Sequence, residues 1–252
     1  MEKKAFWITV IFGKVTIGSI MELDEIFACE SSSDSEHEYP IVTVNGIELR
    51  LMNKHHSLWG ELIWCCGKIV SKAILGKNHG IDFEKKTVIE FGSGSGLCSI
   101  ASSISGAKLV LATDYPDDCI IENLHYNCDS YPNIKICGHK WGEDVSKLLE
   151  LNGGERFDRA ILCDLVFNHS EHKKLLKSLC AVLKSDGVAY LSYTHHRVHL
   201  IQEDLKFIEY ATKKFGLNCS EVFTERHPPM FPNDPGDLDI RTLAYVYALT
   251  FK

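Results

Sequence analysis

The sequence predicts a doubly wound α/β fold with a mostly parallel sheet of seven strands. Three observations lead to this prediction. Short apolar strand patterns alternate with amphipathic helix patterns, the first of these strands runs into a glycine-rich turn, and the last two strand patterns have no helix pattern between them. Alternation needs a parallel sheet covered on both faces, while two consecutive strands indicate an antiparallel pair at one edge. The chain of 252 residues, 45% of them hydrophobic, is long enough for such a domain.

A β-hairpin and a helix are expected before the sheet. Residues 42–44 and 47–49 flank Asn45-Gly46, a dipeptide that tolerates positive φ at both positions of a two-residue turn. Apolar residues then recur at helical spacing over residues 62–74, which predicts one amphipathic helix.

The remaining elements follow in alternation. The expected strands span residues 87–91, 108–113, 133–137, 157–165, 188–194, 220–225 and 242–251. The expected helices span residues 97–104, 117–127, 169–184 and 200–215. Asp117 can cap its helix, and Asn168 with Glu171 has the spacing of a capping box.

Two regions are expected in the chain: a dispensable, disordered tail over residues 1–38 and one domain over residues 39–252. An apolar run near the N-terminus looks briefly like a signal peptide, but Lys14 interrupts it and no clear cleavage site follows. Met21 opens an acidic, serine-rich segment typical of disorder. Met21 is an alternative start to Met1.

Composition excludes several classes of protein. No apolar run reaches the roughly 18 residues of a membrane span, and the net charge of −7 argues against a general nucleic-acid binder. The ten cysteines form no C-x-x-C pair, so neither a zinc site nor a redox motif is indicated. We expect no metal, a reducing compartment and a cytoplasmic location.

The first strand ends in a turn with alternate glycines, E-F-G-S-G-S-G, which lets a ligand approach the backbone closely. Leu97 stands where a dinucleotide fingerprint needs its third glycine, so pyrophosphate binding is not indicated. Asp114 ends the second strand, where a carboxylate can accept both hydroxyls of a ribose. This combination suits an adenosine with a charged, phosphate-free tail, which describes S-adenosylmethionine. The alternative is an ordinary tight turn and a capping aspartate.

The string V-I-E-F-G-S-G-S-G resembles the first motif of seven-β-strand S-adenosylmethionine-dependent methyltransferases with a Rossmann-like fold. Their family-16 branch is suggested by L-W-G-E-L-I-W, T-D-Y-P-D, K-W-G-E-D and L-C-D-L-V-F-N-H-S-E-H. The segment H-P-P-M-F-P-N-D-P-G-D-L-D-I-R is similar to a narrower fungal group, the nicotinamide N-methyltransferase-like proteins. That group methylates the N-terminus and a lysine of translation elongation factor 1-alpha. The resemblance covers about residues 40–252.

The resemblance implies a set of cofactor-binding residues. The turn lies beneath the methionine part, Asp114 binds the ribose, Trp141 lies beside the adenine, and the backbone at Cys163 lines the pocket. Trp64 matches a tryptophan on the helix before the first strand, and the sequence leaves open whether Trp59 contacts the cofactor instead. The implied set is Trp64, Gly92, Ser93, Gly94, Asp114, Trp141 and Cys163. Cys65, Cys66 and Cys163 depart from the small residues expected at their positions.

Asp164 and Phe167 are the expected catalytic residues. Sites of parallel α/β folds lie outside the carboxyl ends of the strands, so Asp164 should face the methyl donor and orient the incoming amine. Phe167 can shape the amine slot. The alternatives are a structural hydrogen bond for Asp164 and core packing for Phe167. His195 and His196 could supply a base but are read as edge residues, and the proline-rich loop over residues 227–239 is assigned to the substrate channel.

The expected function is methylation of the N-terminal glycine and adjacent lysine of elongation factor 1-alpha by a monomeric enzyme. A basic substrate would suit an acidic chain. A small-molecule methyltransferase for nicotinamide or a similar amine shares every cofactor motif and remains the alternative. A third possibility is a non-catalytic module with the same fold.

Overall fold

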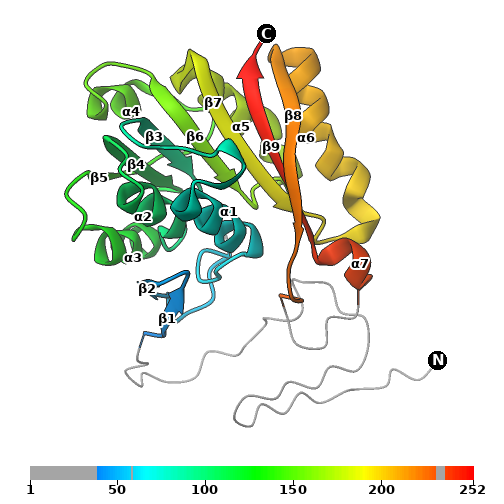
Figure 1. Cartoon of the computed structure of the whole chain (residues 1–252), viewed down its shortest axis with the longest axis horizontal. Coiled ribbons are helices and arrows are strands. Elements are labelled where there is room, and N and C mark those ends of the chain that lie inside the picture. The colour runs from blue at the N-terminus through cyan, green and yellow to red at the C-terminus, as the bar shows by residue number, and fades with distance from the viewer. Residues whose placement is uncertain (1–38, 58, 231–235) are drawn as a thin grey trace.

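The computed structural model describes residues 39–57, 59–230 and 236–252, and the expected tail over residues 1–38 lies outside them. Seven strands form one sheet in the order β5-β4-β3-β6-β7-β9-β8 (Figure 1). Neighbouring strands from β5 to β7 are parallel, whereas β9 runs antiparallel to both β7 and β8. The predicted fold class, including the antiparallel last strand, is confirmed.

The predicted strands are all present, with shifted ends. They are β3 (Thr87–Phe91), β4 (Leu109–Asp114), β5 (Ile134–Gly138), β6 (Phe157–Cys163), β7 (Leu183–Thr194), β8 (Leu217–Arg226) and β9 (Leu243–Phe251). β6 stops two residues early because Asp164 has a φ of 52°, which breaks the extended backbone. β7 begins five residues early because Leu183 already pairs with Phe157.

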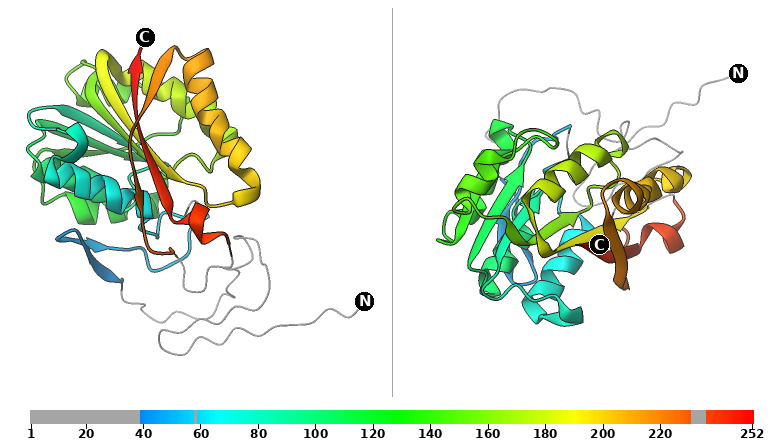
Figure 2. Two further views of the ribbon diagram at one scale, coloured as in Figure 1. Left: turned by 45° about the vertical axis from the view of Figure 1, so that its right-hand side comes forward. Right: turned by 90° about the horizontal axis from the view of Figure 1, so that it is seen from above.

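Helices cover both faces of the sheet (Figure 2). They are α1 (Cys65–Gly76), α2 (Leu97–Ile104), α3 (Asp118–Cys128), α4 (Ser146–Leu151), α5 (His172–Val182), α6 (Ile201–Lys214) and α7 (Leu238–Arg241). One buried cluster joins the sheet to α1, α2 and α3, and a second joins it to α4, α5 and α6. Successive residues of β3 enter different clusters, Val88 the first and Ile89 the second, as the alternation of strand side chains requires.

The predicted hairpin is confirmed as β1 (Ile41–Val44) and β2 (Ile47–Arg50). Asn45 and Gly46 have φ values of 52° and 80°, as a two-residue hairpin turn of this hand needs. The side chains of Asn123 and Asn127 donate hydrogen bonds to the carbonyl of Arg50. These bonds fix the hairpin to α3.

The predicted helices begin and end within three residues of the observed ones. α1 begins at Cys65, three residues late, so Trp64 occupies the N-cap position instead of lying on the helix. Asp117 caps α3 by accepting hydrogen bonds from the amides of Cys119 and Ile120, as predicted. The capping box of Asn168 and Glu171 is wrong: neither residue makes a side-chain cap bond, and a short 3₁₀ turn precedes α5. The short helices α4 and α7 were not predicted.

Candidate active site

Four strands end around one edge of the sheet, at the point where the chain changes direction. From β3 the chain continues to β4 and β5 on one side, while β6 and β7 extend the sheet on the other. In such sheets the crevice at the carboxyl ends of the strands is the usual ligand site. The glycine turn follows β3, Asp114 ends β4, and Asp164 follows β6.

The glycine turn is hydrogen-bonded to the end of β4. The amide of Ser93 donates to the carbonyl of Thr113 at 3.0 Å, and the Ser93 hydroxyl accepts from the Thr113 amide at 3.1 Å. A Cβ atom at Gly92 would lie 2.5 Å from the Leu165 side chain, whereas at Gly94 the nearest atom would be 3.9 Å away. Gly92 is thus required by packing and by a φ of 65°. A Cβ atom at Gly94 would make only ordinary van der Waals contact, with the Gly60 carbonyl, so the turn stays open to a close approach at this position.

The Asp114 carboxylate accepts a hydrogen bond from the turn and still has free acceptor positions. One of its oxygens accepts from the amide of Gly94 at 2.7 Å and the other from the amide of Tyr115 at 2.7 Å. Burial raises the pKa of Asp114, although these two hydrogen bonds and nearby His56 oppose the shift. An ionised carboxylate offers about four lone-pair sites, so two remain for a diol.

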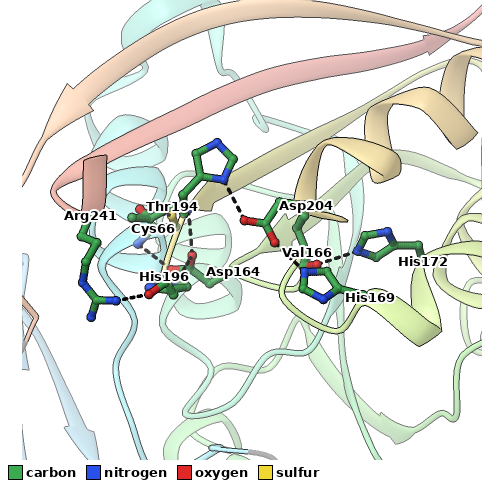
Figure 3. A network of polar contacts seen from close by, with 10 residues as sticks. Cys66, Asp164, Val166, His169, His172, Thr194, His196, Asp204 and Arg241 are labelled. Atoms are coloured by element: carbon green, nitrogen blue, oxygen red, sulfur yellow. Dashed lines mark hydrogen bonds and ion pairs between the residues drawn. The ribbon is translucent and has the colours of Figure 1, made fainter. Parts of the chain in front are cut away.

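Asp164 lies buried, with 2% of its surface exposed, and joins three elements (Figure 3). Its Oδ2 accepts from the amide of Cys66 at 3.0 Å, and its Oδ1 accepts from the Thr194 amide at 3.3 Å and from Nε2 of His196 at 3.0 Å. α1 has no acidic residue in its first turn and no cap bond from Trp64, so this distant carboxylate stabilises the amino end of the helix.

The ionised form of Asp164 is the favoured one. Burial raises its pKa, but the His196 charge and the hydrogen bonds from His196 and Cys66 outweigh burial, and the net pKa lies below the ordinary value. A carboxylate with three donors is well compensated.

Three aromatic rings gather beside Asp164. Phe167 stacks on Trp64 with centroids 5.3 Å apart, and the ring of His196 stands edge-on to Trp64 at 4.8 Å and to Phe167 at 6.2 Å. We call Trp64, Phe167 and His196 the aromatic group. The predicted residues Trp64, Asp164 and Phe167 are thereby brought together, and an electron-rich enclosure of this kind suits a cation or an amine.

A second polar network lies next to the first. Asp204 of α6 is buried and accepts hydrogen bonds from His195 and His169, each at 2.7 Å. His172 donates from Nε2 to the carbonyl of Val166. This network ties the loop after β6 to α6 (Figure 3). Within residues 39–57, 59–230 and 236–252 no cluster of acidic, histidine or cysteine side chains has the form of a metal site.

The predicted residue Trp141 makes contacts of its own. Trp141 packs against the core on the α5 side and lines a surface pocket with Lys173, Lys177 and Phe215. Its loop starts beside Asp114, because the amide of His139 donates to the Asp114 carbonyl at 2.7 Å.

Cys163 and Trp59 have structural contacts of their own. The Cys163 sulfur lies 4.0 Å from that of Cys98 in the core beneath the site. The carbonyl of Trp59 accepts a hydrogen bond from the Trp64 indole at 3.3 Å. Part of the loop over residues 227–239 is described. His227 lies 3.3 Å from the Thr194 hydroxyl, and Arg241 of α7 donates to the His196 carbonyl.

His196 was named with His195 as a possible base but was read as an edge residue. The dipeptide His195-His196 was visible at the end of a strand, but the neighbouring sequence does not indicate which of the two rings faces Asp164. His195 faces Asp204 and His196 faces Asp164. Alternation along the β7 direction was the available signal, because neighbouring residues project to opposite sides.

Comparison with known proteins identifies the family. Residues 43–214 match the family model described as lysine methyltransferase. The chain belongs to this family. It is 36% identical over 239 residues to the protein N-terminal and lysine N-methyltransferase EFM7 of Yarrowia lipolytica, covering 86% of this chain and 85% of that protein. The protein of the same description from Schizosaccharomyces pombe is 38% identical over 222 residues, covering 83% and 86%.

Among solved structures, a protein assigned as a methyltransferase and complexed with SAH superposes with a TM-score of 0.61 at 15% identity. The match covers 88% of this chain but 58% of that one. At this identity the likeness establishes the fold, and it confirms the methyltransferase architecture expected from the sequence. No helix in the described part of the chain is long and apolar enough to cross a membrane.

Proposed function

We propose that this member of the family methylates the N-terminal glycine and the adjacent lysine of translation elongation factor 1-alpha. Protein N-terminal and lysine N-methylation is the activity named for relatives 33–38% identical to the chain. The observation that carries the proposal is the pairing of an open glycine turn with an aromatic group at one edge of the sheet. S-adenosylmethionine is the methyl donor and supplies the electrophilic methyl group when bound.

The residues at the cofactor side fit this donor. Gly92, Ser93 and Gly94 would lie beneath its methionine part, and the free acceptor positions of Asp114 suit the two ribose hydroxyls. We assign Trp141 to the adenine side because its loop begins at the Asp114 carbonyl. Trp64 and the backbone at Cys163 complete the proposed set.

The acceptor side suits an amine. Methyl transfer from a sulfonium to an amine is an in-line displacement, so positioning supplies much of the catalysis. Phe167 and Trp64 would form the walls of the slot. We propose that Asp164 orients the amine through the His196 ring that it holds.

The substrate is expected to be basic and flexible at its amino end. The net charge of −7 would favour encounter with such a protein and would weaken with added salt. A terminal amine titrates near pH 7.7 to 8.0 and a lysine near pH 10.4. The glycine amine is therefore expected to be methylated first and the lysine more slowly.

The proposed active unit is the domain over residues 39–252, working as a monomer in the cytoplasm. The family match begins at residue 43, which is consistent with a dispensable tail. Deleting residues 1–38 is expected to leave the cofactor affinity unchanged within about twofold, because exposed termini contribute little to folded domains.

The test is incubation of the purified full chain with labelled S-adenosylmethionine and purified elongation factor 1-alpha. Peptide mass spectrometry then maps the modified residues. The expected result is label on the N-terminal glycine, followed by the adjacent lysine. A matched reaction contains nicotinamide instead. Efficient methylation of nicotinamide with an unmodified elongation factor would replace the proposal with a small-molecule activity.

A further inference from the structure

We propose that His196 is the general base that removes the proton from the incoming amine, with Asp164 holding its imidazole in the required form. This inference rests on the proposed function for its substrate class. It assigns a role to a residue outside the expected catalytic pair.

The geometry sets the imidazole between a carboxylate and the proposed amine slot. Nε2 of His196 lies 3.0 Å from Oδ1 of Asp164, and the same ring forms one side of the aromatic group with Trp64 and Phe167. Arg241 donates to the backbone carbonyl of His196, which fixes the main chain from the other side. His196 is 8% exposed, so its position is set by packing.

The hydrogen bond to Asp164 also selects the tautomer. An ionised carboxylate can only accept, so the Nε2 nitrogen carries the proton and the Nδ1 nitrogen carries the lone pair. In the described part of the chain no group hydrogen-bonds to Nδ1, and Nδ1 is not among the enclosed atoms without a partner. The lone pair is therefore accessible, which a base requires.

His195 and His172 show that this arrangement is not general to the histidines nearby. Nδ1 of His195 is directed at Asp204. His172 has an enclosed Nδ1 and gives its Nε2 hydrogen bond to the carbonyl of Val166. Of these three rings, only His196 combines a carboxylate partner, a place in the aromatic group and an accessible nitrogen.

The step balances without any further reactant. The substrate ammonium gives one proton to Nδ1 of His196 and becomes a neutral amine. The amine nitrogen then forms a bond to the methyl carbon as the carbon–sulfur bond breaks, and that electron pair stays on sulfur. The product is a methylammonium and a neutral thioether, and the imidazolium returns its proton to water.

A base of this kind should matter more for lysine than for a terminal amine. An ordinary lysine titrates near pH 10.4 and a terminal amine near pH 7.7 to 8.0, so at neutral pH a far smaller share of lysine is already neutral. Removing the base should therefore slow the lysine step more than the glycine step.

Several titratable or charged groups surround the imidazole and bear on any pH profile. Asp164 lies at Nε2, and the thiol of Cys66 on α1 contacts the Thr194 hydroxyl at 3.6 Å. His227 reaches the same hydroxyl at 3.3 Å, and Arg241 approaches from α7. Burial raises the pKa of the Cys66 thiol well above its ordinary value, so it stays neutral across the working range.

The test compares His196→Gln with His195→Asn in the full chain. Glutamine can keep a donor near Asp164 but lacks a basic nitrogen, and asparagine can keep the donor to Asp204. We expect His196→Gln to slow lysine methylation at pH 7 by about a hundredfold and glycine methylation by less than about tenfold. Raising the pH to about 9 should restore much of the lysine rate as free amine accumulates. His195→Asn should retain the native pH profile.

A readout independent of turnover comes from the imidazole ¹⁵N resonances of the cofactor-free protein, with His196 assigned by its loss in His196→Gln. The expected signature is a proton on Nε2 and a lone pair on Nδ1. The opposite tautomer, or a His196→Gln variant with the native pH profile for lysine, would overturn the proposal. If the native chain methylates neither amine, the proposed function fails, whereas the tautomer still reports on the Asp164–His196 pair.

Discussion

The proposed cofactor side and the proposed acceptor side of the site are built in different ways. The cofactor side consists of a turn and the end of the neighbouring strand, with Asp114 bonded to Gly94 only 20 residues away. The acceptor side joins α1, the end of β6 and the end of β7, with Asp164 bonded to Cys66 across 98 residues. Residues that are close in the sequence form a recognisable motif. Residues that are far apart in the sequence form no motif and meet only after folding.

This difference should also separate the effects of mutation. Changes at Asp114 should act on cofactor affinity, and changes at Asp164 should act on turnover. Each substitution below tests whether the two sides are independent.

The largest effect is expected for Asp164→Asn. Asparagine tolerates the positive φ of 52°, so the loop geometry is kept while the negative charge beside His196 is lost. Turnover should fall by about a hundredfold or more, while cofactor affinity by calorimetry stays within about twofold. A parallel loss of affinity would show that the carboxylate serves the cofactor side.

A smaller effect, on binding, is expected for Asp114→Ala. The loss of two charge-assisted hydrogen bonds should cost about 2 to 3 kcal/mol, a weakening of some tens of times in the dissociation constant for S-adenosylmethionine. Calorimetry measures the affinity, and the melting curve serves as the control for folding. Unchanged affinity in a folded variant would remove Asp114 from the cofactor side.

Phe167→Leu should have a moderate effect confined to the acceptor side. Phe167 stacks on Trp64 at 5.3 Å and would form one wall of the proposed slot, so loss of its contact with the bound amine, worth about 0.5 to 1 kcal/mol, corresponds to an about two- to fivefold loss in kcat/KM. Steady-state kinetics with a Gly-Lys amino-terminal peptide measure it. A change in cofactor affinity instead would mean that Phe167 contacts the donor.

The last effect concerns stability beneath the glycine turn and does not involve activity. Burial raises the pKa of Glu90 to about 7, although hydrogen bonds from Ser99 and Ser93 oppose the shift. The folded chain therefore holds this proton more tightly than the unfolded chain. Its contribution to stability is present below about pH 4.5 and is lost as the pH rises to about 7.

Glu90→Gln removes this titration and can keep a hydrogen bond to Ser99. Relative to the native chain, the variant should gain on the order of 1 to 3 kcal/mol between pH 5 and 8. Melting temperatures across that range measure the difference. If the melting temperatures of the two proteins changed with pH in the same way, the raised pKa of Glu90 would not be the cause.

The sequence was sufficient for the parts of the molecule set by local chemistry. Strand periodicity placed every strand of the sheet, Asn45-Gly46 placed the hairpin turn, and Asp117 capped its helix as expected. The start of α1 was missed because the carboxylate that stabilises it comes from Asp164. A capping signal of that kind cannot appear next to the helix in the sequence.

The same distinction between local and long-range contacts applies to the candidate site. Gly92, Gly94 and Asp114 could be proposed from spacing, and Asp164 with Phe167 from a short motif. The sequence could not distinguish His196 from His195, because its proposed role depends on which of the two adjacent rings faces Asp164 and on a tryptophan 132 positions earlier at Trp64. Tertiary contacts between three elements decide both.

The central claim is that the cofactor side and the acceptor side act independently. Its most direct test is a single-turnover measurement of Asp114→Ala and Asp164→Asn at saturating S-adenosylmethionine. Asp114→Ala should recover a methyl-transfer rate within about threefold of the native chain once cofactor is in excess, since its defect is in binding. Asp164→Asn should remain slow at every cofactor concentration. A slow Asp114→Ala at saturation, or an Asp164→Asn rescued by cofactor, would contradict the account.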